Sequence, residues 1–391
     1  MRRIGISGSY GGLNIGDEAI LTCTIAQLRS LVPHAEIVIF SRNADYTRQN
    51  YEVDRAVTVR QITRKEIIPE VQQLDLLLLG GGGILYDDEA YTFLREVRIA
   101  QQFNIPTFCY AIGAGPLVTP EARQAVREVL TQMNGITVRS IKTKQLLEEV
   151  GVDQDIVVTA DPALLLTPQP FTDEMLMREG ICTERPLIGF SIREPGGAAP
   201  GLDESAYHML IADAADFVAR RIDADIVFVP MERKDICHAH QVIAQMVAAD
   251  RAFVLKQQYQ PRQILGLTQR FEMVVGMRLH FLIFAAISSV PFLALPYASK
   301  VTSFIQALGL PPQTLVQERQ AGLLLADIDW LWDNRHKRRE LLREQVPRLQ
   351  ELARQTPILA VQLLERYTSI DIPLKSCLPE ISLNASSTAT V

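Results

Sequence analysis

The sequence has few cysteines, and their placement excludes two roles. The 391 residues contain five, at Cys23, Cys109, Cys182, Cys237 and Cys377, and no two of them form a C-x-x-C pair. An odd, dispersed set predicts reduced thiols in a cytoplasmic protein, because disulfide frameworks and cysteine zinc sites need paired spacing. We therefore expect neither a disulfide framework nor a cysteine-based zinc site.

The sequence also lacks long apolar runs and any excess of basic residues. No stretch approaches the about 18 uninterrupted apolar residues of a transmembrane helix, and the opening MRRIGISGSYGG has no apolar core of a signal peptide. Membrane contact, if any, is expected to be peripheral, at the inner face of the membrane. The formal net charge of −6 argues against a nucleic-acid partner.

What is present is typical of a soluble α/β protein. Hydrophobic residues make up 48% of the chain and charged residues 21%, and its length suffices for two domains with separate cores. Apolar strands ending in glycine turns and followed by helices repeat along the chain, which predicts two doubly wound, Rossmann-like domains facing each other across a cleft. The expected parts are residues 1–170, residues 186–325, C-terminal helices at 326–370 that could cross back between the domains, and a disordered tail at 373–391.

The organising stretch is FEMVVGMRLHFLIFAAISSVPFLALPYASK, residues 271–300. An apolar strand ends at Gly276, and Arg278 and His280 follow at the start of an apolar helix. Such a turn lies at the carboxyl end of a strand, where ligands bind in open α/β sheets, and a helix N-terminus attracts anions. Arginine can hold a phosphate or carboxylate with two hydrogen bonds, and histidine exchanges protons near neutral pH. The pair predicts an anion site with an acid/base group, although each residue alone could be a helix cap.

Two glycine-rich turns follow earlier strands. The first, GSYGGLNIGDEA, ends with Asp17 at the start of a helix, where it could be an N-cap or a catalytic carboxylate. It is neither a G-x-G-x-x-G nor a Walker sequence, so no dinucleotide or nucleoside triphosphate is predicted. The second turn has four glycines, residues 80–83, after a leucine-rich strand. Four glycines could form a flexible turn, but their number favours a binding surface made of exposed backbone.

Further polar residues stand at predicted strand ends, and the histidines elsewhere do not suggest a metal. Arg139, Arg193 and Glu232 each follow a predicted strand, and Lys300 follows the last one. His238 and His240 are two apart on a predicted helix, so they do not share a face for metal binding and are expected at the surface. No metal-ligand cluster and no cofactor are predicted.

Three segments together resemble the polysaccharide pyruvyl transferase family: GSYGGLNIGDEA, LLLLGGGGILYDD, and VVGMRLHFLIFAAISSVPFLAL followed by YASK. The resemblance covers about residues 3–310 and is most specific at G-M-R-L-H. It implies a two-domain fold similar to GT-B glycosyltransferases, with the acceptor on the N-terminal domain and phosphoenolpyruvate on the C-terminal one. It also implies transfer of pyruvate from phosphoenolpyruvate to a sugar of a cell-surface polysaccharide or its lipid-linked precursor, giving a cyclic ketal and phosphate.

The resemblance assigns roles to individual residues. Arg278 and Arg193 are expected to hold phosphoenolpyruvate beside His280, the candidate acid/base, while Asp17 matches the family's acidic residue in the first glycine loop. Ketal formation needs cations for the donor's two anionic groups and proton transfer to and from the reacting atoms. The other expected substrate contacts are Arg139, Lys300, Leu279, Gly12, Gly81, Gly82 and Glu232.

Two other functions fit parts of the sequence. A GT-B-type glycosyltransferase or epimerase that uses a nucleotide sugar would also bind an anion at the turn after Val275, although no carboxylate clearly serves as its ribose ligand. A non-catalytic protein that binds an anionic saccharide would need the cations but not His280. Phosphate release from phosphoenolpyruvate in the presence of sugar acceptors separates the three.

Overall fold

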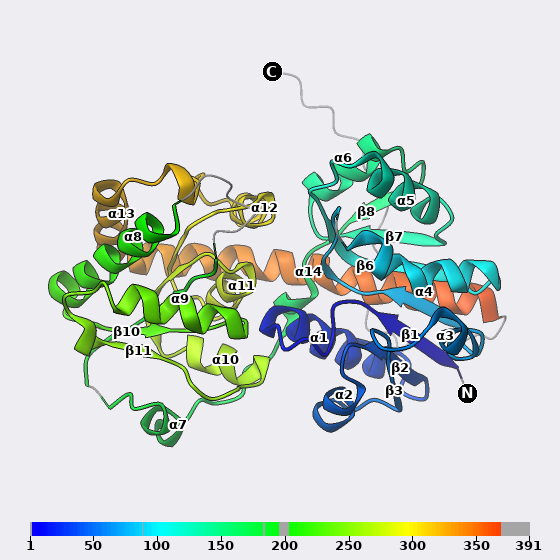
Figure 1. Ribbon diagram of the computed structural model, residues 1–391, viewed down its shortest axis with the longest axis horizontal. Helices are drawn as coiled ribbons and strands as arrows, with labels where there is room; N and C mark the ends of the chain where they lie inside the picture. Colours follow the sequence, from blue (N-terminus) through cyan, green and yellow to red (C-terminus); the bar gives the residue numbers. More distant parts are fainter. Residues whose placement is uncertain (1, 88, 183, 195–202, 369–391) are drawn as a thin grey trace.

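The computed structural model describes residues 2–87, 89–182, 184–194 and 203–368. The chain forms two α/β domains, each built on a parallel sheet, that lie side by side (Figure 1). One long helix, drawn in orange, runs from the C-terminal domain to the N-terminal domain.

The N-terminal domain has an eight-stranded parallel sheet in the order β3-β2-β1-β4-β6-β7-β8, with β5 paired to β6. The order reverses direction between β1 and β4, which makes the carboxyl ends of these strands the expected ligand side. Its strands are β1 (Arg3–Ser7), β2 (Glu36–Ser41), β3 (Arg55–Thr58), β4 (Leu76–Leu79), β5 (Gly82–Leu85), β6 (Thr107–Ala114), β7 (Gly135–Val138) and β8 (Ile156–Val158). Its helices are α1 (Ile15–Leu31), α2 (Ala44–Asn50), α3 (Arg64–Val71), α4 (Ala90–Gln102), α5 (Pro120–Leu130), α6 (Ile141–Val150) and the 3₁₀ helix η1 (Pro162–Leu165).

The C-terminal domain has a five-stranded parallel sheet in the order β11-β10-β9-β12-β13, with its switch point between β9 and β12. Its strands are β9 (Leu187–Ser191), β10 (Asp225–Phe228), β11 (Ala252–Val254), β12 (Phe271–Gly276) and β13 (Phe292–Ala294). Its helices are α7 (Asp173–Arg178), α8 (Glu204–Phe217) with the π-helical turn η3 (Val218–Ile222), α9 (Arg233–Ile243), η4 (Ala249–Arg251), α10 (Pro261–Thr268), α11 (Leu279–Ile287), α12 (Ser299–Ala307), η5 (Val316–Glu318) and α13 (Ala321–Asp333).

Strand β4 explains how the N-terminal core is layered. Successive side chains of a strand point to opposite faces, so Leu76 and Leu78 join one apolar core while Leu77 and Leu79 join the other. The first of these cores continues without interruption into the C-terminal domain. The two domains therefore share buried apolar surface as well as facing each other.

The glycine run differs in part from its prediction as a turn. Gly82 and Gly83 belong to β5, a strand that pairs with Ile112 and Gly113 of β6. A run of glycines has low strand propensity, so pairing to a neighbouring strand, which the local sequence does not reveal, decides its conformation.

In the C-terminal helical segment, Pro347 predicts a break in the helix, and that prediction is wrong. Helix α14 (Arg335–Thr368) contains both Pro347 and Pro357, and the interruption falls instead at Asn334, between α13 and α14. Proline removes one helical hydrogen bond, but packing along the whole of α14 holds the helix together. Its C-terminal half lies on the N-terminal domain, where Thr356 hydrogen-bonds Thr159 at 2.8 Å. The tail predicted to be disordered, 373–391, lies outside the described residues.

Candidate active site

Polar side chains from both domains meet at the carboxyl ends of the two sheets. In the N-terminal domain they follow β1, β7 and β8, and in the C-terminal domain they follow β9, β10, β12 and β13. Helices α1 and α11, which begin after the switch-point strands β1 and β12, pack against each other across the boundary. Figure 1 shows both near the centre of the molecule. This is the place at which parallel α/β sheets bind ligands.

Asn14, not Asp17, caps helix α1. The Asn14 side-chain oxygen accepts hydrogen bonds from the backbone N–H groups of Gly16, at 2.9 Å, and of Asp17, at 3.2 Å. The same asparagine donates a hydrogen bond through Nδ2 to Glu232 of the other domain, and Ile15 N–H donates to the Met231 carbonyl at 2.9 Å. The start of α1 is thus bound to the C-terminal domain, and the cap alternative for Asp17 is wrong.

Asp17 lies within the site, and its environment shifts the pKa of its carboxyl group. Its Oδ1 is 3.1 Å from the position that a Cβ would occupy on Gly82, a residue with φ +99° that glycine adopts most easily. Burial raises the pKa of Asp17, while His280, a hydrogen bond with Ser9, and Lys300 oppose that rise. A carboxylate with a raised pKa is suited to accept a proton from a hydroxyl group.

His280 reaches from the C-terminal domain into the N-terminal one. Its Nδ1 lies only 1.9 Å from the point where a Cβ on Gly16 would stand, so only glycine leaves room for the ring. Its Nε2 lies 3.5 Å from Asp161 Oδ2, and the side chain is 14% exposed. The imidazole is therefore held between the start of α1 and the residue that opens η1.

A buried ion pair stands behind His280. Arg139 Nη1 donates to Asp161 Oδ2 at 2.7 Å, and both side chains are less than a tenth exposed. Burial alone would raise the pKa of Asp161, but His280, Arg139 and the Ala163 N–H together hold that pKa below its usual range. Asp161 is therefore a charged group that can orient the imidazole. Arg139, predicted to contact substrate, is engaged by this carboxylate and packs on Gly113.

Arg278 is fixed by carboxylates of its own domain. Its Nε donates to Asp235 Oδ2 at 3.0 Å and its Nη2 to Asp235 Oδ1 at 2.5 Å, a two-pronged arrangement. Its Nη1 donates to Glu232 Oε1 at 3.2 Å, and Glu194 Oε2 lies 3.8 Å from Nη2. Burial alone would lower the pKa of Arg278, but Asp235 and Glu232 raise it. The guanidinium is therefore always charged, and its carboxylate partners fix its orientation.

Arg193 and Lys300 flank Tyr297. Arg193 Nη1 donates to the Tyr297 hydroxyl at 3.0 Å, and its guanidinium lies 4.6 Å from the ring centre. Lys300 Nζ lies 5.3 Å from the same ring centre. Burial would raise the pKa of Tyr297, but Lys300 and Arg193 lower it overall. Arg193 also pairs with the carboxylate of Glu194.

The other residues predicted to contact substrate differ in how far they are exposed. Leu279 is the first residue of α11 and its side chain is buried, so only its backbone can meet a substrate. Gly12 is exposed beside Arg42, whereas Gly81 packs against Ile20 and the Tyr110 carbonyl in the domain interior.

Five residues of the site escaped the sequence reasoning: Asn14, Asp161, Glu194, Asp235 and Tyr297. Asp161 follows strand β8 and so obeys the strand-end rule that picked out Arg139. Tyr297 follows β13 and obeys the same rule, whereas Asp235 lies inside helix α9 and had no such signal, because its partner Arg278 is distant in sequence. His238 is also corrected: it is not a surface histidine, since its Nδ1 lies 3.0 Å from His208 Nε2 and its side chain is 13% exposed. His240 is exposed, as predicted.

Two parallel-sheet α/β domains with their strand ends facing each other define a protein of the GT-B fold. Solved structures with this fold resemble the chain over nearly its whole length. They include a putative UDP-N-acetylglucosamine 2-epimerase from Listeria monocytogenes, with 15% identity, 95% and 98% of the two chains covered and a TM-score of 0.64. A UDP-GlcNAc 2-epimerase from Neisseria meningitidis bound to UDP-GlcNAc has 12% identity, 93% and 100% of the two chains covered and a TM-score of 0.61. A glycosyltransferase from Rickettsia africae has 9% identity, 94% and 98% of the two chains covered and a TM-score of 0.59.

The chain belongs to the polysaccharide pyruvyl transferase family, because the family's sequence model matches residues 14–299. Family membership makes the protein a transferase and points to a polysaccharide acceptor. No curated protein matches the sequence. Among the described residues, no helix is both long and apolar enough to span a bilayer.

Proposed function

We propose that the protein transfers the pyruvyl group of phosphoenolpyruvate to two hydroxyl groups of one sugar. One observation carries this proposal: cationic groups and proton-transfer groups lie together at the domain boundary. The cations are Arg278, Arg193 and Lys300, and the other groups are the His280–Asp161 pair and Asp17. The donor carries a phosphate and a carboxylate close together, which several cations can bind at once. The family assignment supports the same reaction.

Glu194 marks where the donor's anionic group binds. Its carboxylate pairs with Arg193 and lies 3.8 Å from Arg278 Nη2, so it contacts the two arginines that the family resemblance assigns to the donor. Burial would raise the pKa of Glu194, yet Arg193 and Arg278 lower it, so the two guanidinium groups favour an anion at this point. In the proposed complex the donor's phosphate or carboxylate replaces Glu194 between the arginines.

The reaction balances with these groups alone. A proton adds to C3 of the enol, and the oxygen of one sugar hydroxyl bonds to C2. The second hydroxyl oxygen then bonds to C2 as the C2–O bond to phosphate breaks. Of the two hydroxyl protons released, one replaces the proton delivered to C3 and the other leaves with phosphate. The cations at Arg278 and Arg193 stabilise the departing phosphate.

His280 and Asp17 divide the proton transfers in this proposal. His280 Nε2 lies 3.5 Å from Asp161 Oδ2, so in this proposal Asp161 orients the imidazole and His280 exchanges a proton with the donor. Asp17, on the opposite domain, accepts the proton of the attacking sugar hydroxyl. The acceptor is a sugar of a cell-surface polysaccharide or of its lipid-linked precursor, and we place the reaction in the cytoplasm at the inner membrane face, with no further cofactor.

Ligand-dependent melting and phosphate release test the proposal. Phosphoenolpyruvate should raise the melting temperature more than UDP-GlcNAc does, because a ligand stabilises the folded state that binds it. Acceptor-dependent phosphate release, with a new methyl signal from the ketal in NMR, identifies the reaction. A larger shift with UDP-GlcNAc, together with no phosphate release, would instead assign the protein to the nucleotide-sugar enzymes whose fold it shares.

Two variants separate binding from chemistry. Arg278→Lys keeps the charge facing Asp235 but loses the two-pronged geometry, so it should weaken phosphoenolpyruvate binding. His280→Ala should retain donor binding and lose about 10²–10⁴-fold in turnover, the usual contribution of a general acid. Near-normal turnover by folded His280→Ala would remove the acid/base role.

A further inference from the structure

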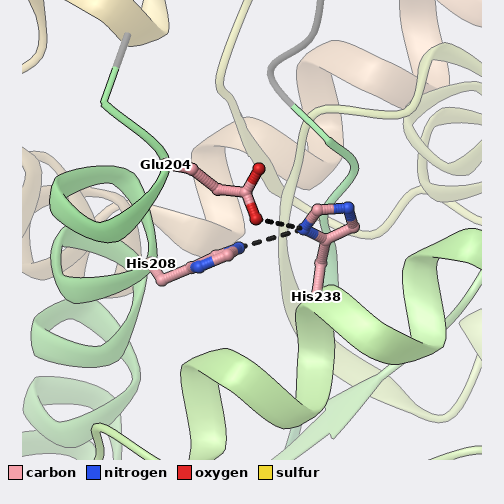
Figure 2. A group of neighbouring side chains, drawn as sticks. All are labelled: Glu204, His208 and His238. Atoms are coloured by element: carbon pink, nitrogen blue, oxygen red, sulfur yellow. Dashed lines mark hydrogen bonds and ion pairs between the residues drawn. The ribbon is translucent and has the colours of Figure 1, made fainter.

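Three potential metal ligands converge between helices α8 and α9 of the C-terminal domain. Glu204 and His208 lie one turn apart on α8, and His238 lies on α9 (Figure 2). One ligand atom from each residue lies within 4.8 Å of the other two. Figure 2 shows the three side chains pointing toward a common point between the helices.

The spacing is close to that of a tetrahedral zinc site. Nitrogen and oxygen ligands about 2.0–2.2 Å from Zn²⁺ stand roughly 3.3–3.5 Å apart when the angles are tetrahedral. His208 Nε2 lies 3.0 Å from His238 Nδ1, and His238 Nδ1 lies 3.9 Å from Glu204 Oε1. All three ligand atoms lie within 4.8 Å of one another, so side-chain rotation must bring the widest pair closer for one ion to bind all three.

The chemistry of the three groups also favours a metal. The side chain of His208 is buried, and imidazole is a common metal ligand. The ring of His208 packs against Tyr207, with centres 5.4 Å apart, which limits its rotation. The carboxylate of Glu204 approaches His238 from the other helix, so two imidazoles and a carboxylate meet at one place.

We propose that Glu204, His208 and His238 bind one divalent transition-metal ion, with Zn²⁺ the best match to two imidazoles and a carboxylate. The ion joins α8 to α9, and water completes its coordination. Helix α9 carries Asp235 and has Glu232 as its N-cap residue. Both carboxylates fix Arg278, so the ion stabilises the helix that supports the anion site. The sequence reasoning missed this cluster because it compared His238 with His240 on the same helix, whereas the partners come from α8.

The test uses the full chain with no affinity tag, stripped of metal by a chelator, and Zn²⁺ or Co²⁺ alone as the probe. Titration against a chromophoric chelator gives stoichiometry and affinity, and the Co²⁺ absorption spectrum reports the coordination geometry. We expect one equivalent of Zn²⁺, a tetrahedral Co²⁺ spectrum, and a melting temperature that rises with Zn²⁺ concentration.

Matched variants locate the site. His238→Gln and Glu204→Gln should each lower Zn²⁺ affinity at least about tenfold, since even residues that only support the ligands contribute 10–100-fold. Glu204 is exposed, so its substitution leaves the fold intact, and equal melting temperatures of the metal-free proteins verify this. His240→Gln and Cys237→Ser, both exposed on α9, should bind as the wild type does.

Three results would overturn the proposal. One is the absence of saturable binding near one equivalent by the metal-free wild type. Another is unchanged affinity in both His238→Gln and Glu204→Gln. The third is loss of binding in Cys237→Ser alone, which would assign the metal to that thiol.

Discussion

At the scale of single residues, the charge of Asp17 is separable from any structural role. Asn14 caps helix α1, so replacing Asp17 removes no cap. Burial raises the Asp17 pKa, which means that the fold disfavours its charged form. We predict that Asp17→Asn keeps or slightly raises the melting temperature, binds phosphoenolpyruvate normally, and loses acceptor-dependent phosphate release severely.

The comparison for Asp17 is made in three measurements on one preparation: thermal melting, donor binding and phosphate release. Asp45→Asn provides the control, because Asp45 is an exposed first-turn carboxylate of α2. Unimpaired phosphate release by Asp17→Asn would remove Asp17 from the mechanism.

Asp161 differs from Asp17, because its charged form is the one the fold favours. Its pKa is lowered in the folded state, so it contributes stability that is present above its unfolded pKa, about 3.9. That contribution is lost as the pH falls from there toward the lowered folded-state pKa. We predict that Asp161→Asn costs about 3–5 kcal/mol at pH 7, because Arg139 is left as an uncompensated buried charge.

The measurement is urea unfolding of wild type and Asp161→Asn at pH 7 and below pH 4. The difference between the two proteins should shrink at the lower pH, where unfolded Asp161 takes up a proton. Asp153→Asn, at an exposed carboxylate, should show little difference at either pH. A constant difference would mean that Asp161 is not charged in the folded protein.

At the scale of elements, the first turn of helix α1 needs a glycine at position 16 because the His280 ring packs against it. An alanine normally stabilises a helix by about 0.5–1 kcal/mol relative to glycine. At Gly16, however, the new Cβ would lie 1.9 Å from His280 Nδ1 and 2.4 Å from its Cγ. We predict that Gly16→Ala lowers both melting temperature and turnover, because the ring or the domain must move.

Gly322→Ala is the matched control for Gly16. Gly322 also lies in the first turn of a helix, α13, and nothing lies within 4 Å of the point where its Cβ would stand. The substitution should be neutral or stabilising, with unchanged turnover. If Gly16→Ala behaved like Gly322→Ala, the position of His280 against α1 would be wrong.

The elements also show what local sequence can predict. The buried strands and the helices after them were recognisable because apolar runs and glycine turns record burial and chain reversal locally. Strand β5 and the continuity of helix α14 through Pro347 were not, since each is decided by packing against distant segments. In the site, strand ends located Arg278, His280 and Asp17, but the pairing of His280 with Asp161 depends on how two domains meet.

At the scale of the whole molecule, α14 joins the domains. Near its start, Arg339 pairs with Glu272 of the C-terminal domain at 2.7 Å. Further along, Gln350 donates to the Leu164 carbonyl at 2.9 Å and Asn134 donates to the Tyr367 hydroxyl at 2.6 Å, both in the N-terminal domain. One apolar core extends through both domains and this helix. The domains are therefore expected to unfold together.

Ala360 tests that coupling because it is fully buried and lies one turn from Thr356, on the face that contacts the N-terminal domain. A carboxylate there has no partner, so we predict that Ala360→Asp destabilises the protein by about 3–5 kcal/mol. Calorimetry should change from one transition to two, and hydrogen exchange should quicken in β1 and β6 before β9 and β12. Arg354→Asp, on the exposed face of the same helix, should keep the single transition. A single transition in Ala360→Asp, merely shifted to lower temperature, would mean that the domains are coupled by α1 and α11 rather than by α14.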